Sequence, residues 1–267
     1  MEESPVDIAE LLQQKLEFEQ SVKYASYIQK ALLPGSNELR YFLPQHFLLF
    51  LPRDVVSGDF YWIHHEDDIT TVAIGDCTGH GVPGAFLSIL GISFLNLVYS
   101  KHSPESPAVL LNYLREYVMK ALNQTGEAYE QKDGIDLSVC MFNNKTGELR
   151  YSGSFSPLYI ARNGELEQLQ GDKMPVGIDA EYEESFTNKS FRLKKEDTVY
   201  IYTDGFPDQF GGPKGKKFKY PAFRKLISNC SKLDIAEQRN FLLTELRNWQ
   251  GKLPQLDDIT VMGFKYK

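Results

Sequence analysis

Five aspartates stand at the ends of apolar segments that the sequence predicts to be β-strands. Asp59 opens one predicted strand in SGDFYW, and Asp76 closes the next in IGDCTGHG. Asp204 closes a late strand in IYTDGF, while Asp257 and Asp258 open the last one in LDDIT. A carboxylate in the middle of a half-buried strand would carry a large desolvation penalty, whereas strand ends can bring several carboxylates to one rim. We therefore expect Asp59, Asp76, Asp204 and Asp257 to meet.

Four carboxylates at one rim repel one another, so this arrangement needs cations. Hard oxygen ligands of this kind favour magnesium or manganese over zinc or copper. The neighbouring glycines agree with this interpretation, since Gly58, Gly79, Gly81 and Gly205 let the backbone approach a metal ion or a phosphate where a Cβ would intrude. One Asp-Gly pair after a strand is usually only a turn, but four such coincidences in order predict a site for divalent cations.

The elements that must position these aspartates are short apolar strands and paired helices. Asn144-Lys145-Thr146-Gly147 and Asn163-Gly164 supply the positive-φ positions that hairpins need, so the sheets are expected to be mainly antiparallel. We predict an α+β fold, a four-layer α-β-β-α sandwich of two sheets flanked by helix pairs, with an N-terminal helical arm. The predicted strands cover residues 47–51, 59–64, 69–76, 137–142, 149–153, 157–161, 165–170, 183–193, 198–203 and 259–264, and the helices 83–101, 106–123, 221–230 and 234–249.

The N-terminal arm is predicted as one helix over residues 6–33, ended by Pro34-Gly35. The heptad signal is weak, because Gln14 and Ser21 fall where a coiled coil needs apolar residues. Packing against the body and pairing with a second chain would each bury its apolar stripe. We divide the chain into this arm, residues 1–35, and a catalytic domain, residues 36–267. The stripe is formed by Leu11, Phe18, Ala25 and Leu32, with Val22 and Ile28 beside them.

Composition narrows the function class. The chain has 267 residues, of which 42% are hydrophobic and 24% charged, as in an ordinary globular protein, and its net charge of -7 argues against a nucleic-acid surface. Three cysteines without CxxC spacing predict neither a disulfide framework nor a zinc site.

Residues 82–99 carry no charge but contain Pro83 and Gly91, so we expect a buried helix and no membrane insertion. No secretion signal is recognisable at the start, and the expected location is the cytoplasm.

The motifs together resemble the SpoIIE/RsbU-type branch of the metal-dependent protein phosphatases, relatives of protein phosphatase type 2C. The resemblance runs from about Ala25 to the end of the chain and includes SYIQKALLP, DVVSGDFYWI, IGDCTGHGVPGAFLS, KMPVGI, IYTDGFPDQFGG and DDITVMGF. It implies two cations, manganese or magnesium, with Asp59 and Asp76 reaching both. The backbone carbonyl of Cys77 would bind one of them, and Asp204 and Asp257 would complete the other. The same resemblance implies a metal-activated water as nucleophile and no covalent phosphoenzyme.

Two residues of the IGDCTGHG motif have competing interpretations. A nucleophilic Cys77 would need the Cys-x5-Arg pattern of cysteine phosphatases, but position 83 is Pro. His80 is a candidate acid for protonating the leaving serine oxygen, and the alternative is a histidine whose ring hydrogen bonds shape the loop.

Further candidates lie outside the four aspartates. Asp133 and Asp136 precede a predicted strand, where relatives sometimes hold a third, weaker metal, although a plain loop role is the simpler interpretation. Arg53 and Gly79 are candidates for binding the substrate phosphate, and the alternative for Arg53 is an ordinary surface arginine. In YSGSFSPLYI this chain has Ser154-Phe155-Ser156 where relatives often show Asn, which puts in doubt any substrate contact made there.

The resemblance implies a protein serine/threonine phosphatase of a bacterial signalling pathway. Its substrate would be a phosphoprotein such as a phosphorylated anti-sigma-factor antagonist, and the N-terminal helix would act as a regulatory arm or form a homodimer. One alternative is a phosphatase-shaped binding module that has lost activity, against which the four intact aspartates argue. A two-metal nucleotide cyclase or phosphodiesterase is another, but the chain shows no P-loop and no HD pair.

Overall fold

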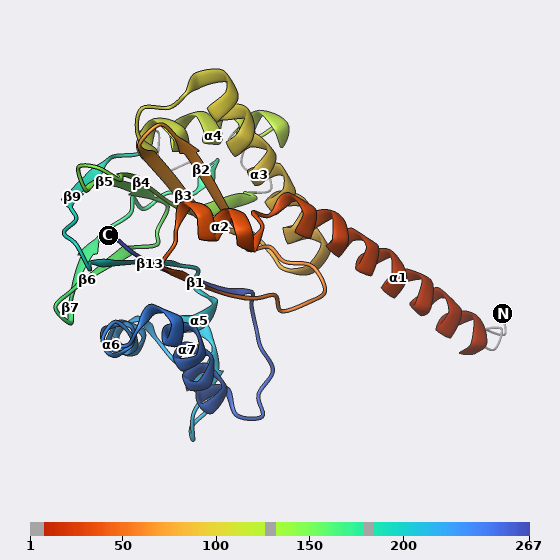
Figure 1. The fold of residues 1–267 in the computed structure, drawn as a ribbon. Coiled ribbons are helices and arrows are strands. Elements are labelled where there is room, and N and C mark those ends of the chain that lie inside the picture. Colours follow the sequence, from red (N-terminus) through yellow and green to blue (C-terminus); the bar gives the residue numbers. More distant parts are fainter. Residues whose placement is uncertain (1–7, 126–131, 179–183) are drawn as a thin grey trace.

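The computed structural model describes residues 8–125, 132–178 and 184–267. Two sheets face each other, and the strand pairs within each sheet are antiparallel (Figure 1). The first sheet has the order β1 (His46–Leu51), β13 (Ile259–Lys265), β10 (Thr198–Tyr202), β6 (Leu158–Arg162) and β7 (Glu165–Leu169). The second has the order β2 (Phe60–Glu66), β3 (Ile69–Cys77), β4 (Gly134–Asn143), β5 (Glu148–Gly153) and β9 (Lys189–Arg192), with β8 (Val176–Gly177) paired to β4.

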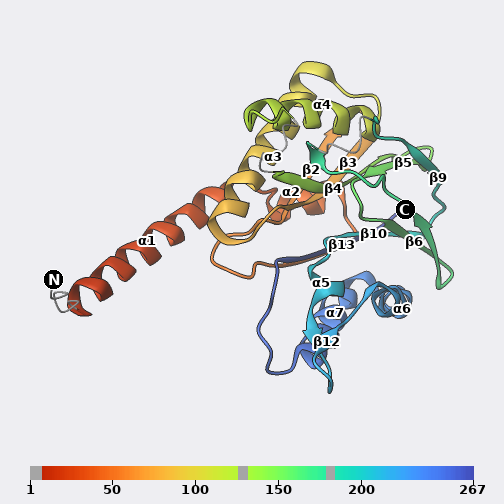
Figure 2. The ribbon, with the colours of Figure 1, turned by 180° about the vertical axis from the view of Figure 1, so that it is seen from behind.

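Helix pairs cover the outer faces of the two sheets (Figures 1 and 2). The helices α3 (Gly81–His102) and α4 (Pro107–Ala121) pack on the second sheet, and α6 (Tyr220–Cys230) and α7 (Ile235–Gln250) pack on the first. The described residues form three apolar clusters, one between the sheets and one under each helix pair. This is the predicted four-layer α-β-β-α sandwich.

The local sequence explains which strands are buried and which lie at an edge. All five residues of β10, TVYIY, are buried, as expected for a strand covered on both faces. The edge strand β7, ELEQL, leaves its glutamates exposed. Asn163 and Gly164 turn the chain between β6 and β7 with φ values of 52° and 82°, which confirms the predicted hairpin.

The N-terminal helix α1 (Ile8–Leu32) leaves the body and projects into solvent (Figure 1). Leu11 and Phe18 of the apolar stripe are exposed, with 64% of Phe18 accessible, whereas Ser26 and Gln29 near the other end are buried. Packing against the body is thus confined to the last turns of the helix. Residues 6 and 7 of the predicted helix, like residues 1–5 of the predicted arm, lie outside the described residues.

The sequence does not predict several short elements. These are α2 (Ser36–Phe42), which places Leu39 in the cluster between the sheets, and the four-residue α5 (Gly205–Asp208). The edge strand predicted over 183–193 is shorter, since β9 covers Lys189–Arg192, and residue 183 is outside the described residues. Also unpredicted are β8 and the small hairpin of β11 (Phe210–Gly211) and β12 (Lys216–Lys217).

Within the described residues, α3 is the one helix long and apolar enough to cross a membrane by length and composition. Its Leu87, Ile92, Leu95 and Val98 are buried in the cluster that packs on the second sheet. A core helix of a globular domain has the same composition, which is the role predicted for this segment.

Candidate active site

The two sheets bring their aspartates to one rim of the sandwich. Asp76 is near the end of β3 and Asp59 directly precedes β2, both in the second sheet. Asp204 follows β10 and Asp257 precedes β13, both in the first sheet. A cavity of about 210 Å³ opens at this rim, and its described lining residues include Asp76, Asp136, Asp204, Asp257 and the Cys77–His80 loop.

Asp59 does not line this cavity but lies beneath it, with only 1% of its surface exposed. Its Oδ2 accepts hydrogen bonds from the hydroxyls of Thr203, at 2.8 Å, and Thr260, at 2.6 Å. Its Oδ1 is buried and has no hydrogen-bond partner among the described residues. The two threonines orient Asp59 and leave one oxygen free for a cation.

Burial raises the pKa of the Asp76 carboxyl well above its usual range, and the charges of Asp59 and Asp204 raise it further. Burial likewise raises the pKa of Asp204, to which the charge of Asp257 contributes. Among the described residues that line the cavity, His80 is the one basic side chain. The site therefore concentrates carboxylates whose ionised forms are poorly compensated by protein groups.

Asp136 lines the cavity, although its sequence position suggests a loop before a strand. The strand β4 begins at Gly134, earlier than predicted, so Asp136 lies within it and pairs directly with Asp76 of β3. Ser154 Oγ donates a hydrogen bond of 3.0 Å to Asp136 Oδ1, and burial raises the pKa of Asp136 to about 6. Asp133 does not line the cavity, and its carbonyl accepts a hydrogen bond from Gln124 Nε2.

Cys77 faces the cavity with its backbone. The side chain belongs to the apolar cluster under α3, where burial raises the pKa of the thiol well above its usual value. A thiol held protonated in a core is a poor nucleophile, whereas the Cys77 carbonyl can act as a ligand.

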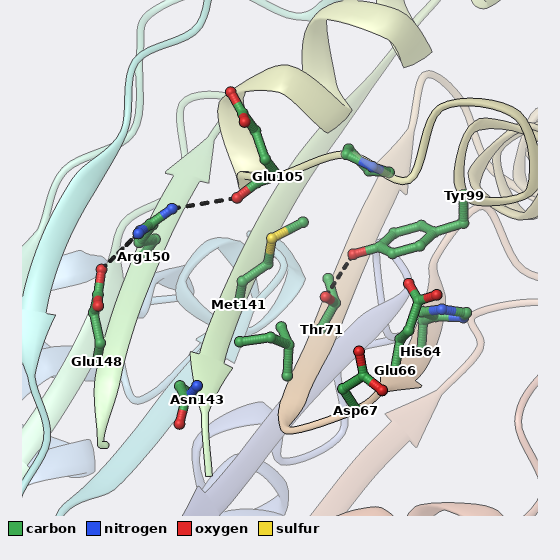
Figure 3. A pocket seen from close by; sticks show the side chains of 12 residues that line it. His64, Glu66, Asp67, Thr71, Tyr99, Glu105, Met141, Asn143, Glu148 and Arg150 are labelled. Carbon is green, nitrogen blue, oxygen red and sulfur yellow. Dashed lines mark hydrogen bonds and ion pairs between the residues drawn. The ribbon is translucent and has the colours of Figure 1, made fainter. Parts of the chain in front are cut away.

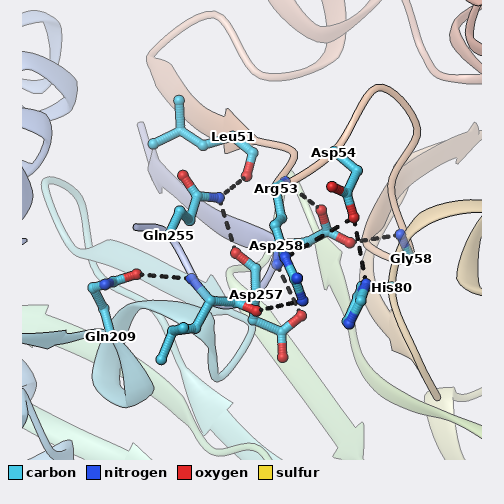
Figure 4. A network of polar contacts seen from close by, with 10 residues as sticks. Leu51, Arg53, Asp54, Gly58, His80, Gln209, Gln255, Asp257 and Asp258 are labelled. Carbon is cyan, nitrogen blue, oxygen red and sulfur yellow. Dashed lines mark hydrogen bonds and ion pairs between the residues drawn. The ribbon is translucent and has the colours of Figure 1, made fainter. Parts of the chain in front are cut away.

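The loop after Cys77 depends on close backbone approach. Gly79 has a φ of 83°, a conformation that glycine adopts without strain. A Cβ on Gly58 would lie 2.7 Å from the Gly79 carbonyl oxygen, and a Cβ on Gly84 would also collide with that oxygen. His80 follows at the mouth of the cavity, with its Nδ1 3.3 Å from Asp54 Oδ2 (Figure 4).

Asp258 supports the rim from behind, a role that the sequence does not reveal (Figure 4). It is 2% exposed, and its two oxygens accept hydrogen bonds of 2.7 Å from the backbone N–H groups of Arg53 and Gly58. Arg53 Nη1 in turn donates to the Leu256 carbonyl at 3.0 Å. Arg53 is not among the described lining residues, although its charge lowers the pKa of Asp257 against the larger effect of burial.

Gln29 ties the arm to the segment that leads into Asp59. Its Nε2 donates to the Ser57 carbonyl at 2.6 Å and to Ser88 Oγ at 2.8 Å, while its Oε1 accepts from Ser57 N–H at 3.1 Å. The only sequence signal for this role is a glutamine inside the SYIQKALLP motif.

The donor atoms of the site fit hard divalent cations. The described residues contain no group of three acidic, histidine or cysteine side chains already arranged to hold a metal ion. The donor set nevertheless consists of carboxylate oxygens with one carbonyl, which suits magnesium or manganese. Asp59 Oδ1 and Asp204 Oδ1 are also buried without hydrogen-bond partners among the described residues, and such oxygens are costly unless a cation binds them.

Solved structures of phosphatase domains share this fold. The chain matches the SiaA-PP2C domain of Pseudomonas aeruginosa with a TM-score of 0.85 and 29% identity, over 95% of this chain and 99% of that one. It resembles the structure of the PP2C phosphatase domain and a fragment of the regulatory domain of SpoIIE from Bacillus subtilis, with a TM-score of 0.66 and 19% identity over 83% of this chain and 62% of that one.

A third similar structure is the PPM Ser-Thr phosphatase MsPP from Mycobacterium smegmatis, with a TM-score of 0.54 and 16% identity over 84% of this chain and 99% of that one. No curated protein sequence matches. The profile described as Stage II sporulation protein E (SpoIIE) matches residues 66–267. The chain therefore belongs to the SpoIIE family of PP2C-type phosphatase domains.

Proposed function

We propose that this protein is a metal-dependent phosphatase that removes phosphate from phosphoserine or phosphothreonine of a partner protein in bacterial signalling. The observation that carries the proposal is the set of poorly compensated carboxylates that both sheets deliver to one open cavity, where Asp76, Asp204 and Asp257 are partly buried and Asp59 is fully buried beneath them. Such a set has no structural use by itself, because unpaired buried charges destabilise a fold.

Asp59, Asp76, Asp204 and Asp257 and the Cys77 carbonyl are the proposed ligands of two cations, manganese or magnesium. Asp136, supported by Ser154, is the better candidate for a third site than Asp133, because it lines the cavity. RsbX, a structural relative with 14% identity, is described in complex with magnesium. When bound, the cations would supply an activated water and neutralise charge on the phosphoryl oxygens.

The chain's own residues would position the reactants. Thr203 and Thr260 hold Asp59, and Asp258 holds the backbone of Arg53 and Gly58. His80 is half-exposed at the cavity mouth and its ring lies beside Asp54, so it is the proposed donor of a proton to the leaving serine oxygen. Arg53 and Gly79 remain the proposed contacts of the substrate phosphate.

The test is turnover of p-nitrophenyl phosphate and of a phosphoserine peptide by the purified chain with manganese, magnesium or EDTA. We expect activity with metal and its reversible loss with EDTA. A chain that binds manganese but turns over neither substrate would be a binding module, and the phosphatase proposal would be abandoned.

We also propose that α1 is a dimer-forming arm and that the protein acts in the cytoplasm on a phosphorylated anti-sigma-factor antagonist or a similar switch protein. The exposed Leu11 and Phe18 support the dimer, since a second chain would cover them. Light scattering and turnover are compared between the intact chain and a version lacking residues 1–24. Unchanged mass and unchanged kinetics would refute the role of the arm.

A further inference from the structure

A second groove, of about 580 Å³, lies between β6 and the start of α6. These two elements lie on the same side of the molecule in both Figure 1 and Figure 2. Ser228 Oγ donates a hydrogen bond to the Gly164 carbonyl in the β6–β7 turn, which fixes α6 against that hairpin. The described lining residues include Phe155, Pro157 and Tyr159 on one side and Tyr220, Pro221 and Arg224 on the other.

Short stretches of chain connect both sides of the groove to the active-site cavity. Ser154 donates a hydrogen bond to Asp136 in the cavity, and the next residue, Phe155, lines the groove. Across the groove, the N–H of Lys219, the residue before Tyr220, donates a hydrogen bond of 2.6 Å to the Pro207 carbonyl in α5, the helix that directly follows Asp204. A chain that places its phosphate in the cavity would continue into the groove.

Phe155 stands on the rim of the groove in a costly conformation. Its φ is 53°, which is uncommon for a bulky residue, and 45% of its surface is exposed. Its backbone N–H donates to the Asp172 carbonyl at 2.8 Å, so the surrounding structure holds it in place. An exposed aromatic ring gains little from packing within the chain, and backbone strain of this kind clusters at binding sites.

The charge of the groove differs from that of the cavity beside it. None of the described lining residues is acidic, and Arg224 is exposed, with Nη2 donating to the Leu166 carbonyl at 3.2 Å. Lys219 and Lys225 are exposed on either side of Tyr220 and Arg224. Along β7, Gln168 faces the groove, and Glu167 points to the opposite face because side chains alternate along a strand.

We infer that this groove binds the segment of the phosphoprotein substrate next to the phosphorylated residue, and that it selects a segment with an acidic side chain for Arg224 and an apolar one for Phe155 and Tyr220. This inference rests on the proposed phosphatase function. The exposed basic residues of the groove and its short chain connections to the cavity are the reasons for this choice of occupant.

The first test compares two phosphoserine nonapeptides that share a leucine beside the phosphoserine. They differ at one other flanking position, which is glutamate in one peptide and lysine in the other. The wild-type chain should prefer the glutamate peptide in kcat/KM, mainly through KM. In Arg224→Glu this preference should fall about tenfold, as expected when an exposed attraction becomes a repulsion. Arg40→Glu makes the same charge change on α2, where Arg40 is exposed, and should leave the preference unchanged.

The second test uses Phe155→Asn, because Asn tolerates the left-handed conformation. We expect an equal or higher midpoint of thermal unfolding together with a several-fold higher KM for both leucine-containing peptides. A purely structural Phe155 would instead lower the midpoint and leave KM unchanged.

Fluorescein-labelled forms of the same peptides, followed by anisotropy, report binding without turnover. Equal affinity for both peptides in the wild type, or no effect of Arg224→Glu on either measurement, would overturn the groove while leaving p-nitrophenyl phosphate turnover intact. A chain without turnover that still prefers the glutamate peptide in binding would support the groove and refute only the phosphatase proposal.

Discussion

Two acidic regions lie at opposite ends of β3 and β4, and they differ in how their charge is handled. At one end is the active-site cavity, with Asp76 and Asp136. At the other is a pocket of about 310 Å³, whose Glu66, Asp67, Glu105 and Glu148 are exposed (Figure 3). There Arg150 pairs with Glu148 at 2.8 Å, and its Nη1 donates to the Glu105 carbonyl (Figure 3).

The comparison shows that the number of acidic residues is a poor indicator of a metal site. The pocket of Figure 3 has as many acids as the cavity, but they are exposed to solvent and Arg150 pairs with Glu148, so no cation is required. The carboxylates of the active site are largely withdrawn from water, and an unpaired buried oxygen remains on Asp59 and on Asp204. Burial without compensation is the feature that indicates metal binding.

The largest expected effect is on catalysis. Asp76→Asn removes a ligand charge from the centre of the cavity, so we expect kcat on p-nitrophenyl phosphate with manganese to fall at least about 100-fold. Glu148→Gln, at the other end of the same sheet, should change kcat less than about twofold. Full activity of purified Asp76→Asn would remove the basis for the two-metal assignment.

The second effect is on the pH dependence of the stability of the fold, measured in EDTA. The pKa of Asp136 is raised to about 6, and that of Asp76 is raised well above its usual range, both mainly by burial. A raised carboxyl pKa means that the protonated fold is favoured, so this stability is present below about pH 4 and is lost as pH rises through 6. Manganese should restore the stability above pH 6, where the carboxylates are ionised.

Thermal unfolding between pH 4 and pH 8, with EDTA and with manganese, measures this effect. Asp136→Asn should flatten the fall between about pH 4 and pH 6, and Glu66→Gln in the other acidic region should not. An identical pH profile for Asp136→Asn and the wild type would contradict the burial argument.

A smaller effect is expected behind the rim. Asp258→Ala leaves the backbone N–H groups of Arg53 and Gly58 without their acceptor, and the free energy of unfolding should fall by about 2–3 kcal/mol. Urea denaturation checks this value, with exposed Glu105→Ala as a control expected within about 0.5 kcal/mol of the wild type. Equal losses in the two variants would mean that Asp258 does not support the rim.

The smallest effect is expected for Cys77→Ser. The thiol lies in the core and the proposed ligand is the carbonyl, so turnover should stay within about threefold of the wild type, with a loss of about 1 kcal/mol in stability. Complete loss of turnover with unchanged metal content would indicate a covalent mechanism.

The fold was largely predictable because each long element carries its own signal. Alternating or fully apolar runs between turns such as Asn163-Gly164 identify the strands, and both helix pairs follow from apolar periodicity. The short elements were missed for a physical reason. The helix α2 and the strand β8 are too short to show a period, and they form because Leu39 and Val176 pack into cores built by other elements.

In the candidate site, too, features with a local sequence signal were predictable and features that depend on contacts between distant segments were not. Strand-end position was sufficient to group Asp76, Asp204 and Asp257 at one cavity. It could not show that Asp257 lines the cavity whereas Asp258 binds the backbone behind the rim, because adjacent aspartates look alike in the sequence. The hydrogen bonds of Gln29 and the place of Asp136 inside β4 depend on contacts between distant segments, which no local pattern records.

The pairing of β1 has a consequence for synthesis of the chain. Leu51 of β1 pairs with Ile259 of β13, and β13 is its one strand neighbour among the described residues. During translation β1 therefore stays unpaired, with its apolar side chains uncovered, until β13 has left the ribosome. Asp257 arrives at the same moment, so a nascent chain acquires this sheet and the last of the proposed acidic ligands together, and shorter nascent forms lack both and are prone to aggregation.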